Sequence, residues 1–457
     1  MEHSDGVQFP AVDGERSTSA AGRAILTDAL RAAGRPPAGD DDWRAAYLDV
    51  LRDLTEHDAP GVAAAGLASV HAHLVQVRDG RERPLAEALA TTSTRTLPTT
   101  EIRGESRRVR ELTVPYDGEV LRGDALRRRV ASWVADGVVE PGFAVGVEDV
   151  LEHPEWLALE GRRVVLLGAG AEMGPLEQLA AWGADVVAVD LPSQSQRVQA
   201  LARTGAGTVR TPGDGADLLT TLPELRAWIG EHDDGRDLVV ASHVYADGGA
   251  HVRLAAAADA LVADLPGASY AALATPTDCY VAPDDAVREA RRRWESRGAV
   301  RLLQAPLRAA SAGRLLRPAY DGGRRLADGL VRQQGPNYAL AKRIQRWRAT
   351  QAAADGRTIS LNLAPATATR SVTRHRALMA AYLGARHFGV EVFAPATTRA
   401  LMAALLVRDL HVPPTAAEDA LANSAAHGGL WRIPYELRSA LQLAALAGFP
   451  RSLLGHR

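Results

Sequence analysis

A tyrosine and a lysine stand four positions apart, at Tyr338 and Lys342, in a segment whose spacing predicts a helix. Residues four apart on a helix lie on the same face, one turn from each other. A neighbouring ammonium group would stabilise the phenolate and lower the tyrosine pKa, so that the hydroxyl could act as general acid or base on a carbonyl or an alcohol. Lys342 is the only lysine in the chain, and arginine is a poor substitute because it stays charged. The alternative is an ordinary exposed pair on a helix.

A glycine turn follows a predicted strand at 164–167, and a predicted helix comes after it. Its glycines are Gly168, Gly170 and Gly174. Glycines let the backbone turn sharply and approach a pyrophosphate, whose charge is stabilised by N–H groups at the helix start. Asp190, at the end of the next strand, is placed to accept hydrogen bonds from ribose hydroxyls. A carboxylate there would repel a 2′-phosphate, which favours NAD over NADP. The alternatives are S-adenosylmethionine, which uses a similar turn and acid, and a purely structural turn.

From residue 162 onward, short β-rich runs alternate with segments of helical length. The predicted strands are 164–167, 185–189, 238–242, 270–274, 358–363 and 390–393. Such alternation predicts an α/β fold in which a parallel, doubly wound, Rossmann-like sheet has helices on both faces. An arginine-rich helical stretch at 282–335 is interpreted as an insertion within this domain.

Shifts in composition and periodicity predict that the chain has three parts. Residues 1–22 are polar and predict a flexible tail, residues 23–150 predict a mostly helical N-terminal region, and residues 151–457 hold the α/β domain. Within the N-terminal region, 91–100 is expected to be a linker and 110–116 a short strand.

The motif at Tyr338 and Lys342 is followed by a predicted strand and a turn that contains Asn362 and Pro365. This arrangement resembles the short-chain dehydrogenase/reductase superfamily, in which a Tyr-x-x-x-Lys helix precedes a strand and an Asn-x-x-x-Pro-Gly-like turn near the nicotinamide. The resemblance covers roughly the last 300 residues. It implies a Rossmann-like fold, an NAD or NADP cofactor and a homo-oligomer.

The resemblance also covers the glycine turn, which in the superfamily reads Thr-Gly-x-x-x-Gly-x-Gly. Here Leu167, Gly168, Glu172 and Gly174 fall on those four places. Two of the four match. Leu167 lacks the hydroxyl of the usual threonine, and Glu172 adds bulk and negative charge where the diphosphate would lie.

Further roles follow from the resemblance alone. It implies that Asp214 contacts the adenine, that Ser242 belongs to the cofactor-binding turn after the fourth strand, and that Thr275 or Thr277 orients the substrate carbonyl. The superfamily places that hydroxyl much closer in sequence to the tyrosine. The insertion at 282–335 must therefore loop out if the hydroxyl is to reach Tyr338.

Polar residues after the fourth and fifth strands are candidates to line a substrate pocket, because ligands of open α/β sheets bind at the carboxyl ends of the strands. Tyr245, His251 and Asp278 are such residues. Helix capping is the alternative for each of them, and Asp278 could also be a second acid or base. The spacing of His243, Asp247 and His251 matches no standard metal site, so no metal is expected.

Composition limits the possible partners of the chain. Its formal net charge of −2 gives no support to binding of nucleic acid or membrane surfaces, so a small-molecule substrate is expected. The single cysteine, Cys279, cannot form an intramolecular disulfide, and no signal or membrane-spanning segment is recognised, which indicates a cytoplasmic protein.

The function predicted from the sequence is that of an NAD(P)-dependent oxidoreductase that reduces a carbonyl or oxidises an alcohol of a small metabolite. The alternatives are a non-redox lyase, cyclase or isomerase on the same scaffold, an S-adenosylmethionine-dependent transferase, and a non-catalytic binding protein.

Overall fold

A seven-stranded sheet forms the centre of the molecule in a computed structural model that describes residues 5–37, 43–91 and 95–454. Its strand order is β14-β11-β10-β7-β8-β9-β4, and every neighbouring pair is parallel except β4 with β9. The strands are β4 (Thr99–Arg103), β7 (Arg162–Leu167), β8 (Asp185–Val189), β9 (Thr208–Pro212), β10 (Asp237–Ser242), β11 (Ser269–Ala274) and β14 (Ile359–Leu363). This mixed α/β architecture is consistent with the predicted Rossmann-like fold.

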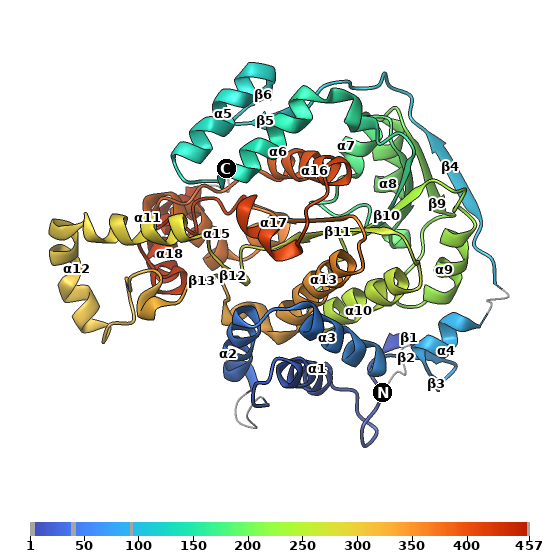
Figure 1. Cartoon of the computed structure of the whole chain (residues 1–457), viewed down its shortest axis with the longest axis horizontal. Coiled ribbons are helices and arrows are strands. Elements are labelled where there is room, and N and C mark those ends of the chain that lie inside the picture. The colour runs from blue at the N-terminus through green and yellow to red at the C-terminus, as the bar shows by residue number, and fades with distance from the viewer. Residues whose placement is uncertain (1–4, 38–42, 92–94, 455–457) are drawn as a thin grey trace.

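Helices cover both faces of the sheet, as the nearly continuous apolar runs of the strands require. One face packs on α9 (Leu222–Gly230), α10 (Gly249–Ala263) and α13 (Gly335–Ala354), and the other on α7 (Leu176–Ala181), α8 (Ser195–Arg203) and α16 (Pro395–His411). Strand β7 shows the division: Val165 and Leu167 belong to the first core, and Val164 and Leu166 to the second. Figure 1 shows the resulting layers.

The first part of the N-terminal region packs on the outside of α10 and α13 (Figure 1). Its elements are β1 (Gly6–Gln8), α1 (Thr18–Ala32), α2 (Trp43–Glu56), α3 (Pro60–Ala72), β2 (Val75–Arg78), β3 (Arg81–Pro84) and α4 (Leu85–Ala90). The prediction of a tail over 1–22 is wrong for its described part, because β1 pairs with β2 and α1 begins at Thr18.

The second part of this region belongs to the α/β body. The linker predicted at 91–100 ends in β4, which starts at Thr99 and becomes the antiparallel edge of the central sheet. The short strand expected within 110–116 is confirmed as β5. The elements are β5 (Thr113–Tyr116), β6 (Glu119–Arg122), α5 (Gly123–Ala135), α6 (Pro141–Glu152) and η1 (Pro154–Ala158). Helix α6 packs against α16.

The insertion leaves the sheet after β11 and returns to it before α13. Strand β12 (Cys279–Val281) pairs with β13 (Leu326–Asp328) in antiparallel register, with Cys279 opposite Asp328, and so closes the base of the insertion. Between them lie α11 (Asp284–Glu295), α12 (Gly298–Ala310) and η3 (Asp321–Gly323), and η4 (Arg332–Gln334) follows β13. The predicted insertion at 282–335 therefore loops out.

The remaining helices are η2 (Pro192–Gln194), α14 (Arg370–Thr373), α15 (Arg376–Ala385), η5 (Arg386–Phe388), α17 (Ala417–Asn423) and α18 (Leu437–Leu454). Helices α15 and α18 pack on each other beside the insertion (Figure 1). The prediction of a strand at 390–393 is wrong, because Phe393 forms only an isolated β-bridge to Thr367.

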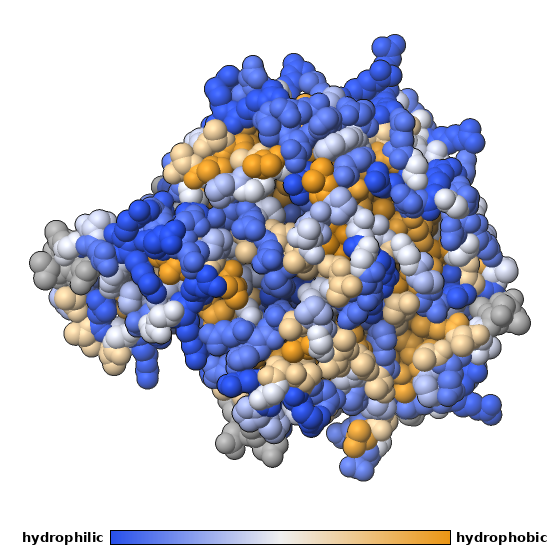
Figure 2. All heavy atoms as spheres, in the orientation of Figure 1, coloured by the Kyte–Doolittle hydropathy of each residue, from blue (hydrophilic) through white to orange (hydrophobic). Residues whose placement is uncertain are grey.

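The arginines of the insertion are largely exposed. Arg288, Arg291 and Arg292 of α11 lie in the solvent-facing part of the helix, and the protruding end of the molecule is mostly hydrophilic on the face in Figure 2. Among the described residues, no helix combines the length and apolar character needed to cross a membrane.

Two arginines of α13 are almost completely buried. Arg343 donates to Asp58 Oδ2 at 3.2 Å, and Arg346 donates to Asp278 Oδ2 at 2.9 Å and to Glu418 Oε2 at 2.7 Å. The three carboxylates come from the α2–α3 junction, the loop after β11 and α17. This buried ionic cluster therefore joins the N-terminal region, the sheet and the C-terminal part on one helix.

Replacing Arg346 by Met should destabilise the protein strongly, because Asp278 and Glu418 would lose their main partner at a buried site. Breaking a buried ion pair by removing one partner typically costs about 3–5 kcal/mol. Urea unfolding of Arg346→Met should show this loss. Arg292→Met, whose side chain is 72% exposed, is the control and should change little. Equal midpoints for the two variants would contradict a structural role of the cluster.

Candidate active site

Tyr338 lies in the first turn of α13, at the carboxyl end of β11. Its Oη donates to Oγ1 of Thr275 at 3.2 Å, although the two residues are 63 positions apart in sequence. Thr275 Oγ1 lies 3.0 Å from Thr277 Oγ1, and Gln334 Nε2 donates to Thr277 at 2.6 Å. The β12–β13 pair removes the insertion from this gap, so both predicted hydroxyl residues reach the neighbourhood of Tyr338.

Lys342 follows one turn later and reaches the same strand end. Its Nζ donates to the carbonyl oxygen of Leu273 at 3.3 Å and to Gln345 Oε1 at 3.0 Å. Gln345 Nε2 in turn donates to Ser242 Oγ at 3.4 Å. Burial lowers the pKa of Lys342 to about 8, against a smaller opposing effect of Asp278. Lys342 is thus held by neutral acceptors.

The predicted lowering of the tyrosine pKa is wrong for the chain without ligands. Burial raises the pKa of Tyr338 above its usual range, although the hydrogen bonds from Thr275 and Thr277 act in the opposite direction. Desolvation therefore outweighs the stabilising groups at the phenolic oxygen, and the hydroxyl is protonated at neutral pH.

His251 packs edge-on against Tyr338, with ring centroids 5.2 Å apart. It is only 1% exposed, and neither ring nitrogen has a hydrogen-bond partner among the described residues. Burial, and to a smaller extent Lys342, lowers its pKa to about 3, so the ring is neutral. Tyr245 also packs edge-on against His251, with ring centroids 5.1 Å apart, and is half exposed. These two predicted pocket residues therefore do lie beside Tyr338.

The glycine turn meets the end of β10. Gly168 has φ +81°, and a Cβ there would lie 2.8 Å from the carbonyl oxygen of His243. The Gly170 N–H donates to Asp190 Oδ2 at 2.6 Å, and the Leu191 N–H donates to Asp190 Oδ1 at 2.7 Å. Burial raises the pKa of Asp190 despite these bonds. The turn and its acid are thus together, as the sequence predicted.

Glu172 ties the glycine turn to the segment after β14. Its Oε2 accepts the backbone N–H of Arg370 at 2.9 Å and lies 3.6 Å from the Arg370 guanidinium. Arg399 donates to the backbone oxygen of Glu172 at 3.1 Å. The negative charge expected at the turn is therefore present beside Arg370, whereas Arg399 forms its ion pair with Glu177.

Three predicted cofactor residues have other surroundings. Gly174 closes the turn through its N–H, which donates to the carbonyl oxygen of Ala171 at 2.9 Å. Asp214 is exposed after β9, and the backbone of the neighbouring Ala216 bonds to Asp190. Pro365 is buried, and its carbonyl oxygen accepts a hydrogen bond from Thr367 at 2.8 Å.

Asn362 faces α16 rather than Tyr338. Its Nδ2 donates to Asp409 Oδ2 at 2.7 Å and to Ser360 at 3.0 Å, and Ser360 donates to the same carboxylate oxygen at 2.8 Å. Burial raises the pKa of Asp409 to about 6. The expected contact of this amide with a nicotinamide is replaced by a buried polar group that joins β14 to α16.

Asp278 belongs to the buried ionic cluster on α13. Both carboxylate oxygens are engaged, one by Arg346 at 2.9 Å and the other by the Cys279 N–H at 2.7 Å. Its predicted role at the substrate is therefore replaced by a structural one, because the arginines of α13 need compensating charges.

Sequence reasoning missed Gln345, Asp409 and Tyr382. Gln345 has a local signal, since i and i+3 positions on a helix are neighbours. Asp409 and Tyr382 have none, because α16 and α15 are distant in sequence. Tyr382 lies close enough to Tyr338 to interact with it electrostatically. Burial, together with this interaction, raises the pKa of Tyr382 to about 12.

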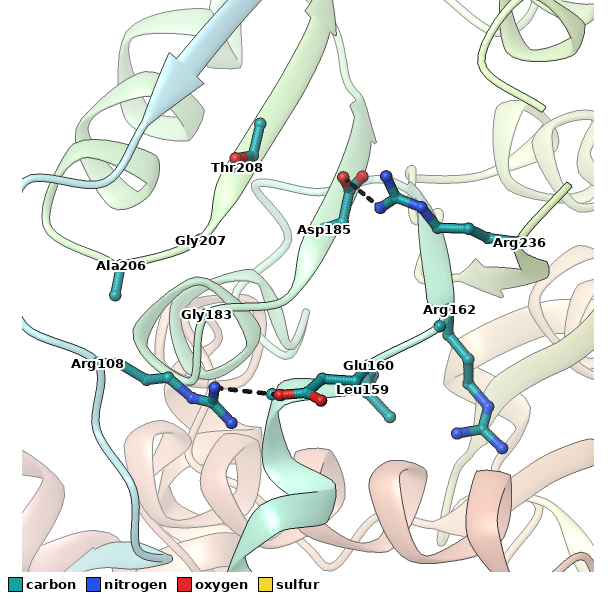
Figure 3. Close-up of a pocket in the computed structure, with 12 residues that line it drawn as sticks. Arg108, Leu159, Glu160, Arg162, Gly183, Asp185, Ala206, Gly207, Thr208 and Arg236 are labelled. Carbon is teal, nitrogen blue, oxygen red and sulfur yellow. Dashed lines mark hydrogen bonds and ion pairs between the residues drawn. The ribbon is translucent and has the colours of Figure 1, made fainter. Parts of the chain in front are cut away.

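A pocket of about 360 Å³ lies at the opposite edge of the sheet, where β7, β8 and β9 begin (Figure 3). Arg108, Glu160, Asp185 and Arg236 line it, and two of its arginines are in ion pairs: Arg236 with Asp185 at 2.9 Å and Arg108 with Glu160 at 3.5 Å. It is remote from Tyr338, which lies at the carboxyl ends of the strands.

In the part of the chain that the structure describes, no three histidine, cysteine, aspartate or glutamate side chains are grouped to hold a metal ion. Comparison of the chain with protein-family models and with curated proteins gave no match. The function must therefore be inferred from the geometry at Tyr338.

A comparison of two buried histidines, His251 and His427, tests whether the ring nitrogens of His251 lack hydrogen-bond partners. His427 is fully buried, lies 2.8 Å from Glu140 and accepts the Gly429 N–H at 3.0 Å. His427→Phe should lose about 1–3 kcal/mol or more, because buried partners stay unsatisfied, whereas His251→Phe should change the free energy of unfolding little. Chemical denaturation of both variants measures this difference. Equal losses would show that His251 is bonded within the protein.

Stability should depend on pH through Asp409. Its pKa of about 6 in the folded state exceeds the unfolded value of about 3.9, so wild-type stability contains a penalty that grows from pH 4 to pH 6 and persists above. Asp409→Asn removes this penalty, and its Oδ1 can still accept from Ser360 and Asn362. The variant should gain up to about 3 kcal/mol relative to wild type between pH 4 and pH 7.

Thermal unfolding across this pH range measures the effect of Asp409. Asp124→Asn, at a side chain that is 82% exposed, corrects for the general loss of one negative charge. A stability difference between Asp409→Asn and wild type that stays constant with pH would contradict the penalty.

Proposed function

We propose that this chain is an enzyme of short-chain dehydrogenase/reductase type, an NAD(P)-dependent oxidoreductase that reduces a carbonyl or oxidises an alcohol of a small metabolite. The observation that carries the proposal is the 3.2 Å hydrogen bond from Tyr338 Oη to Thr275 Oγ1. Lys342 binds the carbonyl oxygen of Leu273, which lies two residues before Thr275 at the same strand end. The Tyr338 hydroxyl, which can exchange a proton, and the Thr275 hydroxyl, which can orient a substrate oxygen, therefore lie within hydrogen-bonding distance of each other.

The sheet order supports a Rossmann-like assignment. The six parallel strands run outward from β7 in both directions, and the order reverses between β7 and β10. Open α/β sheets bind ligands at such a switch point, outside the carboxyl ends of the strands. The glycine turn follows β7, and His243 follows β10.

The residues at the turn fit a dinucleotide. Gly170 leaves a cradle that a side chain would fill, since a Cβ there would lie 3.1 Å from Asp190. Gly168, Gly170 and Gly174 would hold the diphosphate, and Asp190, which is partly exposed, would accept the ribose hydroxyls. A bound nicotinamide supplies the hydride-transfer chemistry that no side chain can provide.

The chain's own residues would handle the oxygen and its proton. Thr275 would orient the substrate oxygen, and Tyr338 would give a proton to it during reduction or take one during oxidation. Lys342, in its protonated form, would bring a positive charge to the site and favour the phenolate against the opposing effect of burial. His251 and Tyr245 would line the pocket.

A second candidate is non-redox proton chemistry, such as that of a lyase, cyclase or isomerase. Glu172 favours it, because its carboxylate lies at the turn where a diphosphate would have to bind. Tyr338 and Thr275 would then act on a carbonyl without a nucleotide.

Calorimetric titration with NADH, NADPH and S-adenosylmethionine tests the cofactor. Tighter binding of NADH than of NADPH is expected from the charge of Asp190. Glu172→Gln should tighten NADH binding severalfold, because it removes a like charge from the diphosphate site. Absence of nicotinamide binding in both proteins would favour the second candidate, and binding of S-adenosylmethionine would favour a transferase.

Tyr338→Phe should lower turnover with a responsive aldehyde, ketone or alcohol by about 10²–10⁴-fold, because the variant cannot exchange a proton. Its fold should persist, since the aromatic ring stays in place and the hydroxyl gives up a partly buried hydrogen bond to Thr275. Tyr382→Phe is the matched control at a neighbouring tyrosine and should keep most of the activity. Near-wild-type turnover of Tyr338→Phe would refute its role.

A further inference from the structure

We propose that Lys342 is a nucleophile that captures small, neutral aldehydes or ketones as an imine when no nucleotide covers it. This activity goes beyond the oxidoreductase proposal and does not depend on it, because it requires only the amine, an acid and an accessible carbonyl. It would supply the electron sink that the cofactor-free alternative needs.

The amine of Lys342 has no anionic partner among the described residues. Its two contacts, the carbonyl oxygen of Leu273 at 3.3 Å and Gln345 Oε1 at 3.0 Å, are neutral acceptors. Asp278 is the acid whose charge reaches it, but the arginines of α13 hold that carboxylate. An ammonium that is partly buried without a counterion is easily deprotonated, and a desolvated lysine amine is the usual source of an imine-forming nucleophile.

The composition of the chain gives an independent indication. Every other basic side chain of this type is arginine, including the exposed positions where lysine would serve equally well. A guanidinium holds its proton and cannot attack a carbonyl. The only lysine therefore stands where burial favours deprotonation of its amine, one helical turn from the Tyr338 hydroxyl.

The surroundings of the amine suit a neutral carbonyl compound. Leu273, the uncharged ring of His243 and the aromatic ring of Tyr338 lie around this strand end, and burial lowers the pKa of His243 to about 3. Arg343, the next residue, and Arg346, one turn further along α13, are engaged by carboxylates, so these two leave no free cation to receive a substrate carboxylate. We therefore assign aldehydes and ketones rather than oxo acids.

The step balances with groups that are present. The neutral amine nitrogen bonds to the carbonyl carbon, and the π electrons move to oxygen, which takes a proton from Tyr338. The nitrogen returns a proton to the tyrosine to give a carbinolamine. Tyr338 then protonates the hydroxyl, which leaves as water while the C=N bond forms, and the nitrogen of the resulting iminium returns its proton to the tyrosinate. The products are an imine and one water, with no oxidant or reductant consumed.

Because the chain has one lysine, the imine can be detected without knowing the substrate. The folded protein is incubated at pH 7 with propanal and sodium cyanoborohydride, and adduct formation is followed by intact mass and peptide mapping. The amino-terminal α-amine of the purified protein, wherever its chain begins, is a second primary amine and serves as an internal reference. Lys342 should be alkylated at least about tenfold faster in the folded protein than in urea, because more of the amine is neutral when folded.

Two variants identify the reacting groups. Lys342→Arg should form adducts only at the amino-terminal amine, and Tyr338→Phe should slow labelling of Lys342 while leaving the rate at the amino-terminal amine unchanged. Labelling of Lys342 in the folded protein at or below the rate in urea would overturn the proposal, as would undiminished labelling in Tyr338→Phe.

Addition of NADH separates this proposal from the oxidoreductase proposal. If a nucleotide binds at the turn and reaches Lys342, it should protect the amine from propanal. Fast labelling that NADH leaves unchanged would support the imine and count against the cofactor site. Binding of NADH together with slow labelling of Lys342 in the nucleotide-free protein would support the cofactor site and count against the imine.

Discussion

Burial of two guanidinium groups on one helix is the constraint on which the arrangement of this molecule depends. A buried charge is costly unless it is paired and hydrogen-bonded. Arg343 and Arg346 meet this demand with Asp58, Asp278 and Glu418, which come from segments far apart in sequence. Tyr338 lies in the first turn of the same helix, so the pairing that compensates the charges also fixes the tyrosine at the end of β11.

A second ionic contact explains why the N-terminal helices cannot be separated from α13. Asp259 of α10 accepts hydrogen bonds from Arg348 of α13 at 2.6 Å and lies 2.7 Å from His71 of α3. Gly66 of α3 allows Trp347 to lie against the helix, because a Cβ there would come within 2.5 Å of the indole. The N-terminal region is thus an outer layer of the α/β body that holds α13 in place.

Local features could be predicted from the sequence, and distant pairings could not. The strands at 164–167, 185–189, 238–242 and 270–274 follow from apolar runs, whereas β9, with the sequence TVRTP, was missed because it has no such run. The approach of Asp190 to the glycine turn follows from the strand–turn–helix spacing. The roles of Asn362 and Asp278 differ from the prediction because their partners, Asp409 and Arg346, lie on elements whose position the sequence does not reveal. The position of β4 at the sheet edge was missed for the same reason.

The paired strands β12 and β13 have a consequence for how this chain can change over time. They hold the two ends of the insertion together, with Cys279 opposite Asp328, before the chain enters α13. Lengthening the segment between them adds only a slowly growing entropy of loop closure. Evolution, or a protein engineer, can therefore rebuild or replace α11 and α12 as a module while the spacing of Thr275 and Tyr338 stays fixed.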